Sequence, residues 1–277
     1  MNQTIYPIGI QNFEKIRKDG YLYIDKTALI YQLVKTGSYY FLSRPRRFGK
    51  SLLLSTLEAY FQGKKELFEG LAMEKLEKEW TKHPILHFDL NISHYDAPDS
   101  LYKILNDTLS RYEEEYGTRP TEETLPLRFA GIIDRAYRKT GQRAVILIDE
   151  YDKPLLQNLH DEEMQNRFRN MLKPFYGVLK TMDRAIRFAL LTGVTKFGKV
   201  SVFSDLNIWT IYPCGSLTPP FAASRKRSCV RISMRTSIRW PLPLSGHTRR
   251  PDPCYGNGTT AIISWPGDRA FITLSAC

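Results

Sequence analysis

Four short apolar runs along the chain are typical of buried β-strands. They lie at residues 39–42, 85–90, 144–148 and 186–191. The first is largely aromatic (YYFL), and the third (AVILI) has no polar position. A run that is apolar throughout favours a strand covered on both faces, as in a parallel sheet. The pattern therefore predicts buried strands in a mostly parallel sheet.

Helical patterns separate these runs, because apolar side chains recur there every three or four residues and so share one face of a helix. Helices are predicted at residues 28–34, 51–61, 101–116 and 127–139, and a further one has its apolar face between Met164 and Phe175. Gly37 and Gly141 are expected to end two of them. Strands and helices alternate, which predicts an α/β fold with helices flanking the sheet.

Two smaller predictions concern the first half of the chain. Asp25 or Thr27 is expected to lie near the cap of the helix at residues 28–34. Asp25 and Lys26 are expected to belong to a solvated cap or, alternatively, to contact a nucleotide base or a partner. Residues 64–80 alternate charged and apolar positions and are expected to form a helix on the surface, ended by Pro84. The apolar positions of this stretch are Leu67, Phe68, Leu71, Met73 and Leu76.

Charge is unevenly distributed along the chain. The 277 residues carry a net charge of +11, but residues 207–277 hold 9 of the 40 Lys and Arg and only 2 of the 29 Asp and Glu. All four cysteines lie in this last part, at spacings that fit no metal site. No apolar run reaches 18 residues and no signal peptide opens the chain, so we expect a cytoplasmic protein with no membrane contact.

The residues after the first predicted strand form a candidate phosphate-binding loop. Gly49, Lys50 and Ser51 match the second half of the pattern G-x-x-x-x-G-K-[ST], and Arg44 occupies the place of the first glycine. Backbone N–H groups at a helix start attract an anion, and a glycine lets the backbone approach it closely. Lys50 would reach the phosphates, and the Ser51 hydroxyl would bind Mg²⁺. The alternative is a basic loop before an ordinary helix.

The third predicted strand ends in two acids, Asp149 and Glu150. They stand at the carboxyl end of a strand, where open α/β sheets bind ligands. Asp149 would hold Mg²⁺ together with Ser51, and Glu150 would activate a water molecule as general base. Acids in this position also occur as simple solvated residues, but the presence of Lys50 in a GKS loop favours a nucleotide site.

Other candidate residues lie around these motifs. Thr192 ends the fourth predicted strand and is expected to contact the γ-phosphate or the attacking water, with Thr195 in reserve; either is also an ordinary turn residue. The catalytic candidates are thus Glu150, Lys50 and Thr192. Arg46 and Arg47 are expected either to contact phosphate, within the chain or across subunits, or to face solvent. The full set of nucleotide-binding candidates is Arg46, Arg47, Phe48, Gly49, Lys50, Ser51 and Leu52.

The strand at residues 85–90 lies between the two motifs in the sequence. This arrangement suggests the class of P-loop folds that places a strand between the strand before the phosphate loop and the strand carrying the acids, and that uses a catalytic glutamate.

Four stretches resemble the bacterial AAA-ATPase-like family. They are YPIGIQNFEKIRKDGYLYIDKT, FLSRPRRFGKSLLLSTLEAYFQG, LIDEYDKP and LLTGVTKFGKVSVFSDLN, and the resemblance covers about residues 5–207. RPRRFGKS is the usual loop of that family, so Arg44 is no defect. The resemblance implies a P-loop NTPase that binds ATP through Lys50 and Ser51, with Asp149 and Glu150 as the Walker B pair. It also implies a C-terminal nuclease-like domain of the PD-(D/E)XK type, through which any nucleic acid would be contacted.

The resemblance ends after Asn207, where the composition also changes. A shift of the reading frame can be tested on paper, because the first two bases of each codon would become the last two bases of a codon in the other frame. In that frame, GTTAIIS (residues 258–264) can be read as WYDGYHF, and RAFITLSAC (residues 269–277) can be read as PGIYNPFSL. Both products resemble motifs that follow the ATPase core of the family. We therefore predict that residues 208–277 are an out-of-frame, irregular and largely disordered tail, and that the chain is truncated. The alternative is a genuine basic tail.

The expected function is Mg²⁺-dependent ATP binding by a domain at residues 1–207, with ATP hydrolysis as its activity. Two alternatives remain open. One is a nucleotide-binding switch without turnover, and the other is the regulatory module of a nuclease whose catalytic domain is missing. An oligomer is compatible with all three readings.

Overall fold

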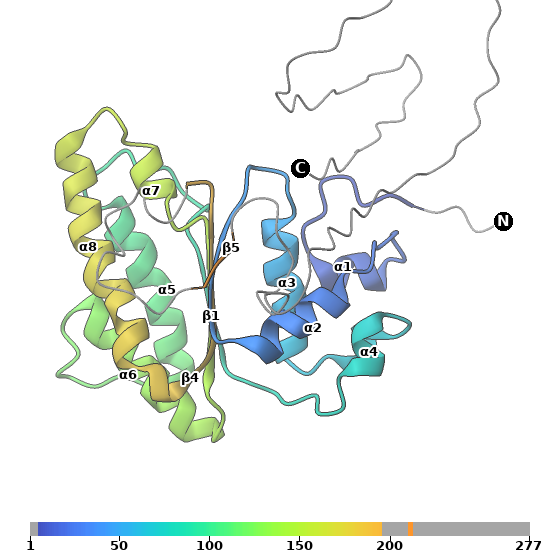
Figure 1. Cartoon of the computed structure of the whole chain (residues 1–277). Coiled ribbons are helices and arrows are strands. Elements are labelled where there is room, and N and C mark those ends of the chain that lie inside the picture. The colour runs from blue at the N-terminus through green and yellow to red at the C-terminus, as the bar shows by residue number, and fades with distance from the viewer. Residues whose placement is uncertain (1–4, 196–209, 213–277) are drawn as a thin grey trace, which may run out of the picture. The chain divides into compact units, whose positions relative to one another are not determined.

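The computed structural model describes residues 5–195 and 210–212 (Figure 1). All of them belong to the first of two units into which the chain divides, Met1–Leu217. The second unit, Thr218–Cys277, lies outside the described residues, and so does almost all of the segment predicted to be out of frame.

The centre of the fold is a five-stranded sheet with the strand order β2-β3-β4-β1-β5, in which every neighbouring pair is parallel. The four predicted strands are confirmed to within two residues. The strands are β1 (Tyr39–Ser43), β2 (Ile85–Asp89), β3 (Ala144–Asp149), β4 (Ile186–Gly193) and β5 (Thr210–Tyr212).

The strand between β1 and β3 in the sheet is β4, not the β2 that lies between them in the sequence. The fold class predicted from the motifs therefore holds, but with a different strand in the middle. The burial of the strands explains the order: β3 is buried at every residue, whereas buried and half-buried residues alternate along β2. Alternating burial suits a strand at the edge of a sheet, and continuous burial suits an inner one.

Helices cover both faces of the sheet (Figure 1). One layer contains α5, α6 and α8, and the other contains α1 to α4; α7 is a short helix in the connection that follows β3. The helices are α1 (Phe13–Lys18), α2 (Thr27–Thr36), α3 (Lys50–Phe61), α4 (Ala72–Leu76), α5 (Ser100–Tyr116), α6 (Leu125–Thr140), α7 (Lys153–Leu156) and α8 (Glu162–Thr181). The predicted α/β fold, with helices flanking a parallel sheet, is thus confirmed.

Each helical layer packs on its own hydrophobic core. Successive side chains of β3 alternate between the two cores: Ile146 and Ile148 join the core under α5, α6 and α8, whereas Val145 and Leu147 join the core under α1 to α4. This alternation follows from the pleat of a strand, which points neighbouring side chains to opposite faces. The run of apolar residues at positions 144–148 of β3 is therefore required.

The predicted helix at residues 64–80 is wrong. The segment instead forms a 3₁₀ turn (Lys65–Phe68) and the short helix α4, separated by Gly70 in a left-handed conformation (φ 76°). Leu67, Phe68 and Met73 are buried in the core. The segment is not a surface helix, because its apolar side chains turn inward at spacings that one helix cannot present.

Asp25 is exposed and binds the first residue of α2, as expected of a solvated cap, and it also connects two helices. Its Oδ1 accepts hydrogen bonds from the backbone N–H and hydroxyl of Thr27 (2.8 and 2.6 Å), and its Oδ2 accepts one from Ala72 N–H (2.7 Å). One carboxylate thus ties the start of α2 to the start of α4. The predicted ends at Gly37 and Gly141 are confirmed, since these residues cap α2 and α6.

The short strand β5 lies inside the segment predicted to be irregular. It pairs with the free edge of β1, so that Phe41 is in register with Ile211. An unpaired strand edge presents backbone hydrogen-bonding groups, and Thr-Ile-Tyr is a sequence with high strand propensity. Among the described residues, no helix combines the length and the apolar character that crossing a membrane requires.

Candidate functional site

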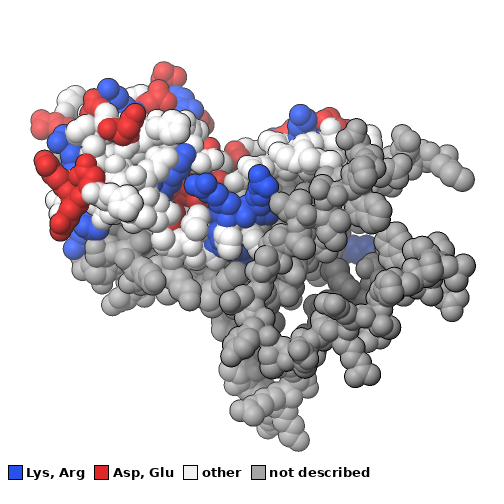
Figure 2. All heavy atoms as spheres, turned by 90° about the horizontal axis from the view of Figure 1, so that it is seen from above, with Lys and Arg blue, Asp and Glu red and all other residues white. Residues whose placement is uncertain are grey.

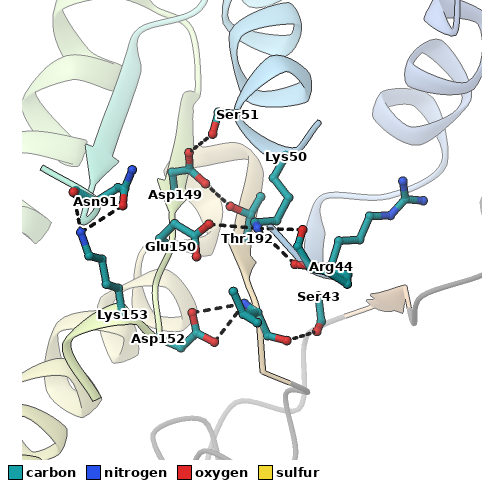
Figure 3. A network of polar contacts seen from close by, with 12 residues as sticks. Ser43, Arg44, Lys50, Ser51, Asn91, Asp149, Glu150, Asp152, Lys153 and Thr192 are labelled. Carbon is teal, nitrogen blue, oxygen red and sulfur yellow. Dashed lines mark hydrogen bonds and ion pairs between the residues drawn. The ribbon is translucent and has the colours of Figure 1, made fainter. Parts of the chain in front are cut away.

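The carboxyl ends of β1, β3 and β4 meet at one edge of the sheet, and the predicted site residues gather there (Figure 3). Figure 2 views this edge from above and shows Lys and Arg side chains grouped near its middle. Parallel strands bring their carboxyl ends to the same edge, which is where open α/β sheets bind ligands. The sheet therefore assembles residues that are far apart in the sequence.

The 44–51 loop follows β1, and its last two residues are the first two of α3. Gly49 is the N-cap of α3 and has a left-handed backbone (φ 75°), which glycine adopts at no steric cost. Arg47 is also left-handed (φ 68°), a conformation that costs a residue with a Cβ atom about 1 kcal/mol. The turn therefore directs the backbone N–H groups at the start of α3 toward the edge of the sheet.

Lys50 is buried although it carries a charge, with 4% of its surface exposed. Its Nζ lies 2.9 Å from Glu150 Oε1 and donates hydrogen bonds to the carbonyl oxygens of Arg44 (3.1 Å) and Pro45 (3.4 Å) (Figure 3). A buried ammonium group needs such partners to offset its loss of water. The lysine side chain thus lies beneath the loop, where it contacts the loop backbone and the residue that follows β3.

Asp149 joins three elements of the site. Its Oδ2 accepts a hydrogen bond from Ser51 Oγ at the start of α3 (2.6 Å), and its Oδ1 accepts one from Thr192 Oγ1 at the end of β4. Asp149 is buried, with 6% of its surface exposed. The serine of the GKS motif and the acid that ends β3, which are predicted to act together, are therefore in direct contact.

Glu150 has a left-handed backbone (φ 53°), which is unusual for a residue with a side chain. Such conformations persist only where the surrounding structure holds them in place, and they cluster at functional sites. The strand ends at Asp149, so the left-handed residue turns the chain away from the sheet while its carboxylate reaches Lys50.

The remaining candidate residues of the 44–51 loop lie on the outer side of the loop or beneath it. Arg46 and Arg47 are exposed, and within the described part of the chain neither guanidinium group forms an ion pair. Phe48 is 37% exposed. Leu52 is half-buried and packs against the core under α1 to α4, so only its backbone faces the loop.

Thr195, the reserve candidate, does not contact Asp149. Its backbone N–H and hydroxyl both donate to Asp152, and its hydroxyl also lies 3.1 Å from the Tyr151 hydroxyl. Asp152 was not identified from the sequence. The available signal is the run DEYD at the strand end, because its third acid follows the two predicted site residues at the same edge of the sheet.

The turn at residues 193–195 also contacts the start of the 44–51 loop. Arg44 N–H donates to the carbonyl oxygen of Gly193 (3.0 Å), and Ser43 Oγ donates to that of Val194 (3.0 Å). Ser43 carries no sequence signal of its own, because a serine at a strand end is common. Only the position of β4 beside β1 reveals its contact.

A magnesium ion bound with a nucleotide fits the residues present. Ser51 and Asp149 supply hard oxygen ligands, and Mg²⁺ is usually held by one or two carboxylates together with phosphates and water. In the described part of the chain, no group of three or more His, Cys, Asp or Glu side chains is arranged to hold a metal. The donor set thus suits an ion that binds together with phosphate better than it suits an ion held by protein ligands alone.

Comparisons with known proteins agree with this arrangement. A family model described as "Predicted AAA-ATPase" matches residues 7–203. A curated protein of Azotobacter chroococcum mcd 1, named "Uncharacterized protein in vnfD 5'region", is 43% identical over 209 residues, which make up 75% of this chain and 40% of that protein. The chain thus spans less than half the length of this relative. No solved structure matches the present chain. The parallel α/β sheet is consistent with a P-loop NTPase, and the chain belongs to the predicted AAA-ATPase family.

Proposed function

We propose that residues 1–207 bind ATP together with Mg²⁺ and hydrolyse it. The observation that carries this proposal is the 2.6 Å hydrogen bond between Ser51 and Asp149. It joins a GKS loop at a helix start to an acid at the end of a buried strand, the combination that P-loop NTPases use for nucleotide and metal. A cytoplasmic location, where ATP and Mg²⁺ are supplied, is part of the same proposal.

The 44–51 loop would hold the phosphates. Backbone N–H groups from Phe48 to Leu52 stand at the positive end of α3, and Gly49 leaves room for a phosphate oxygen. Lys50 would leave the carbonyl oxygens of Arg44 and Pro45 and neutralise phosphate charge. Arg46 and Arg47 are exposed beside the same loop and are proposed to contact phosphate as well, in the same chain or across a subunit boundary.

Ser51 and Asp149 would hold Mg²⁺, which when bound neutralises charge on the phosphate oxygens. Both side chains already face each other, so their oxygen atoms need little rearrangement. Thr192 donates to the other oxygen of Asp149 and keeps the carboxylate in this orientation. A direct contact of Thr192 with the γ-phosphate or the attacking water remains part of the proposal.

Glu150 would act as general base toward water. Its carboxylate is occupied by Lys50 in this structure, so the lysine must move to the phosphates before the carboxylate is free. Binding and activation are thereby linked, since one movement supplies the phosphate contact and releases the base. The step itself transfers a proton from water to Glu150 while the water oxygen attacks the γ-phosphorus and the bond to ADP breaks.

The test combines binding and turnover. Calorimetry with Mg²⁺ and ATP should show binding by the parent chain that is lost in Lys50→Ala but kept in Lys103→Ala, which removes an exposed lysine of α5. Turnover that disappears in Glu150→Gln while binding persists supports an ATPase. Binding without turnover in the parent chain would instead indicate a switch, and a folded parent chain that binds no ATP contradicts the proposal.

A further inference from the structure

The turn after β4, residues 193–195, is held by one buried carboxylate. Asp152 has no exposed surface, and its Oδ2 accepts hydrogen bonds from Val194 N–H (3.0 Å), from Thr195 N–H (2.6 Å) and from the Thr195 hydroxyl. Three donors from two consecutive residues thus converge on a single side chain. The carboxylate comes from the turn after β3, so it connects the ends of two neighbouring strands.

A buried carboxylate is costly unless its oxygens are satisfied. Among the described residues, Asp152 forms no ion pair, and its partners are backbone N–H groups and a hydroxyl. Hydrogen bonds from N–H to a carboxylate are about twice as strong as neutral ones. Asp152 therefore holds the backbone of the turn at residues 193–195 in place, because it binds the main-chain N–H groups of that turn.

The two turns are also packed tightly against each other. A Cβ atom on Gly193 would lie 2.4 Å from the Tyr151 ring and 2.7 Å from Asp152 Oδ1, so only glycine fits. Tyr151 N–H donates to the carbonyl oxygen of Thr192 (2.9 Å), and the Tyr151 hydroxyl lies 3.1 Å from Thr195 Oγ1. Residues 151–152 and 192–195 thus form one interlocked unit.

This unit contacts the proposed ATP site on both sides. On one side Thr192 donates to Asp149. On the other side the carbonyl oxygens of Gly193 and Val194 accept hydrogen bonds from Arg44 N–H and Ser43 Oγ, where the 44–51 loop begins. A displacement of the turn would therefore move Thr192 and the loop entry together.

We propose that Asp152 is a positioning residue for ATP hydrolysis. It holds the turn at residues 193–195 so that Thr192, Asp149 and the first residue of the 44–51 loop keep a fixed separation around the reacting phosphate. The inference rests on the proposed ATPase function and adds a residue to it that touches neither nucleotide nor metal. Displacements of about 1 Å in such a frame are enough to lower turnover by about 10²-fold.

The first test is Asp152→Asn, which keeps the shape but leaves one acceptor oxygen and places an amide NH₂ near groups that donate. We expect turnover to fall at least about tenfold while the affinity for Mg²⁺-ADP changes less than about threefold. The matched control is Asp161→Asn, because Asp161 also accepts a backbone N–H, at the exposed start of α8, and asparagine is an equally good cap.

Thr195 provides a second, milder test if Asp152→Asn does not fold. Thr195→Val removes the hydroxyl that donates to Asp152 and should lower turnover, whereas Thr195→Ser keeps the hydroxyl and should restore it. A role in overall stability alone predicts no such rescue. Equal losses of nucleotide affinity and turnover, or wild-type turnover in both Asp152→Asn and Thr195→Val, overturn the inference.

Amide hydrogen exchange separates this inference from the proposed function. In Asp152→Asn without nucleotide, the N–H groups of Val194, Thr195 and Arg44 should exchange faster than in the parent chain, while those of α8 should not. Should the parent chain hydrolyse no ATP, the proposed function fails and the role in hydrolysis fails with it, whereas a faster exchange confined to these groups still shows that Asp152 holds the turn. Unchanged exchange at Val194 and Thr195 contradicts it.

Discussion

Lys50 Nζ lies 2.9 Å from Glu150 Oε1, so the two side chains with the most demanding proposed roles are paired with each other. Both are largely buried, with 3% and 16% of their side-chain surface exposed. A pair in this setting is held more firmly than one on the surface, where water screens the charges. The proposed phosphate ligand and the proposed base therefore restrain each other until a stronger anion competes for the lysine.

Glu150→Gln should separate these two effects. Loss of the general base is expected to lower turnover by at least about 10²-fold. Affinity for Mg²⁺-ADP should not fall and is expected to rise, because Lys50 no longer has a charged competitor. Steady-state turnover of ATP and calorimetry with ADP, which has no γ-phosphate to be hydrolysed, measure the two quantities independently. Weaker ADP binding in this variant would show that the ion pair does not compete with nucleotide.

Ser51→Ala should make nucleotide binding insensitive to Mg²⁺. The hydroxyl is one of the two proposed metal ligands and its partner is Asp149 (2.6 Å). We expect ADP affinity in the presence of Mg²⁺ to fall to the value measured with EDTA, and Ser51→Thr to retain the difference, because threonine keeps the oxygen. Calorimetry with and without EDTA provides the comparison. A Mg²⁺ effect that survives in Ser51→Ala would place the metal ligands elsewhere.

Gly193→Ala is expected to destabilise the fold by about 1–3 kcal/mol, the usual cost of forcing extra volume into a packed site. The new methyl group would meet the Tyr151 ring at 2.4 Å. Gly177→Ala is the matched control, because nothing lies within 4 Å of its added Cβ and the residue is inside α8. That variant should gain about 0.5–1 kcal/mol, since alanine favours a helix over glycine. Urea unfolding measures both, and equal stabilities would contradict the proposed packing.

The pair of His87 and Glu58 should make stability depend on pH. Burial lowers the pKa of His87, but the Glu58 carboxylate at 3.4 Å and the nearby Asp149 and Asp89 outweigh it and raise the pKa above 6.5. A histidine whose pKa is raised on folding stabilises the protein at pH values below its unfolded pKa. That contribution is lost as the pH rises through the folded pKa.

His87→Gln should therefore be less stable than the parent chain at about pH 6, with a difference that shrinks toward about pH 8. Urea unfolding of both proteins at several pH values tests this expectation. The control is His160→Gln, for which no carboxylate partner exists among the described residues. A difference between parent and His87→Gln that is constant with pH would show that the charge of His87 contributes nothing.

Local patterns were sufficient to predict much of this protein. The apolar runs identified β1 to β4, and the spacing of apolar residues identified the longer helices, because burial of one face imposes a period on the sequence. The GKS loop and the acids after AVILI were recognisable as motifs. Their convergence could also be expected, since the carboxyl ends of parallel strands share one edge of the sheet.

The tertiary structure decided what depends on neighbours distant in the sequence. The position of β4 between β1 and β3 depends on how the chain crosses from one strand to the next, and the local spacing of apolar residues does not indicate this. The pairing of Lys50 with Glu150, and the binding of Val194 and Thr195 by Asp152, exist only because that order brings the strand ends together. The buried turn at residues 65–68 was missed for the same reason: its side chains follow the shape of the core and not the period of a helix.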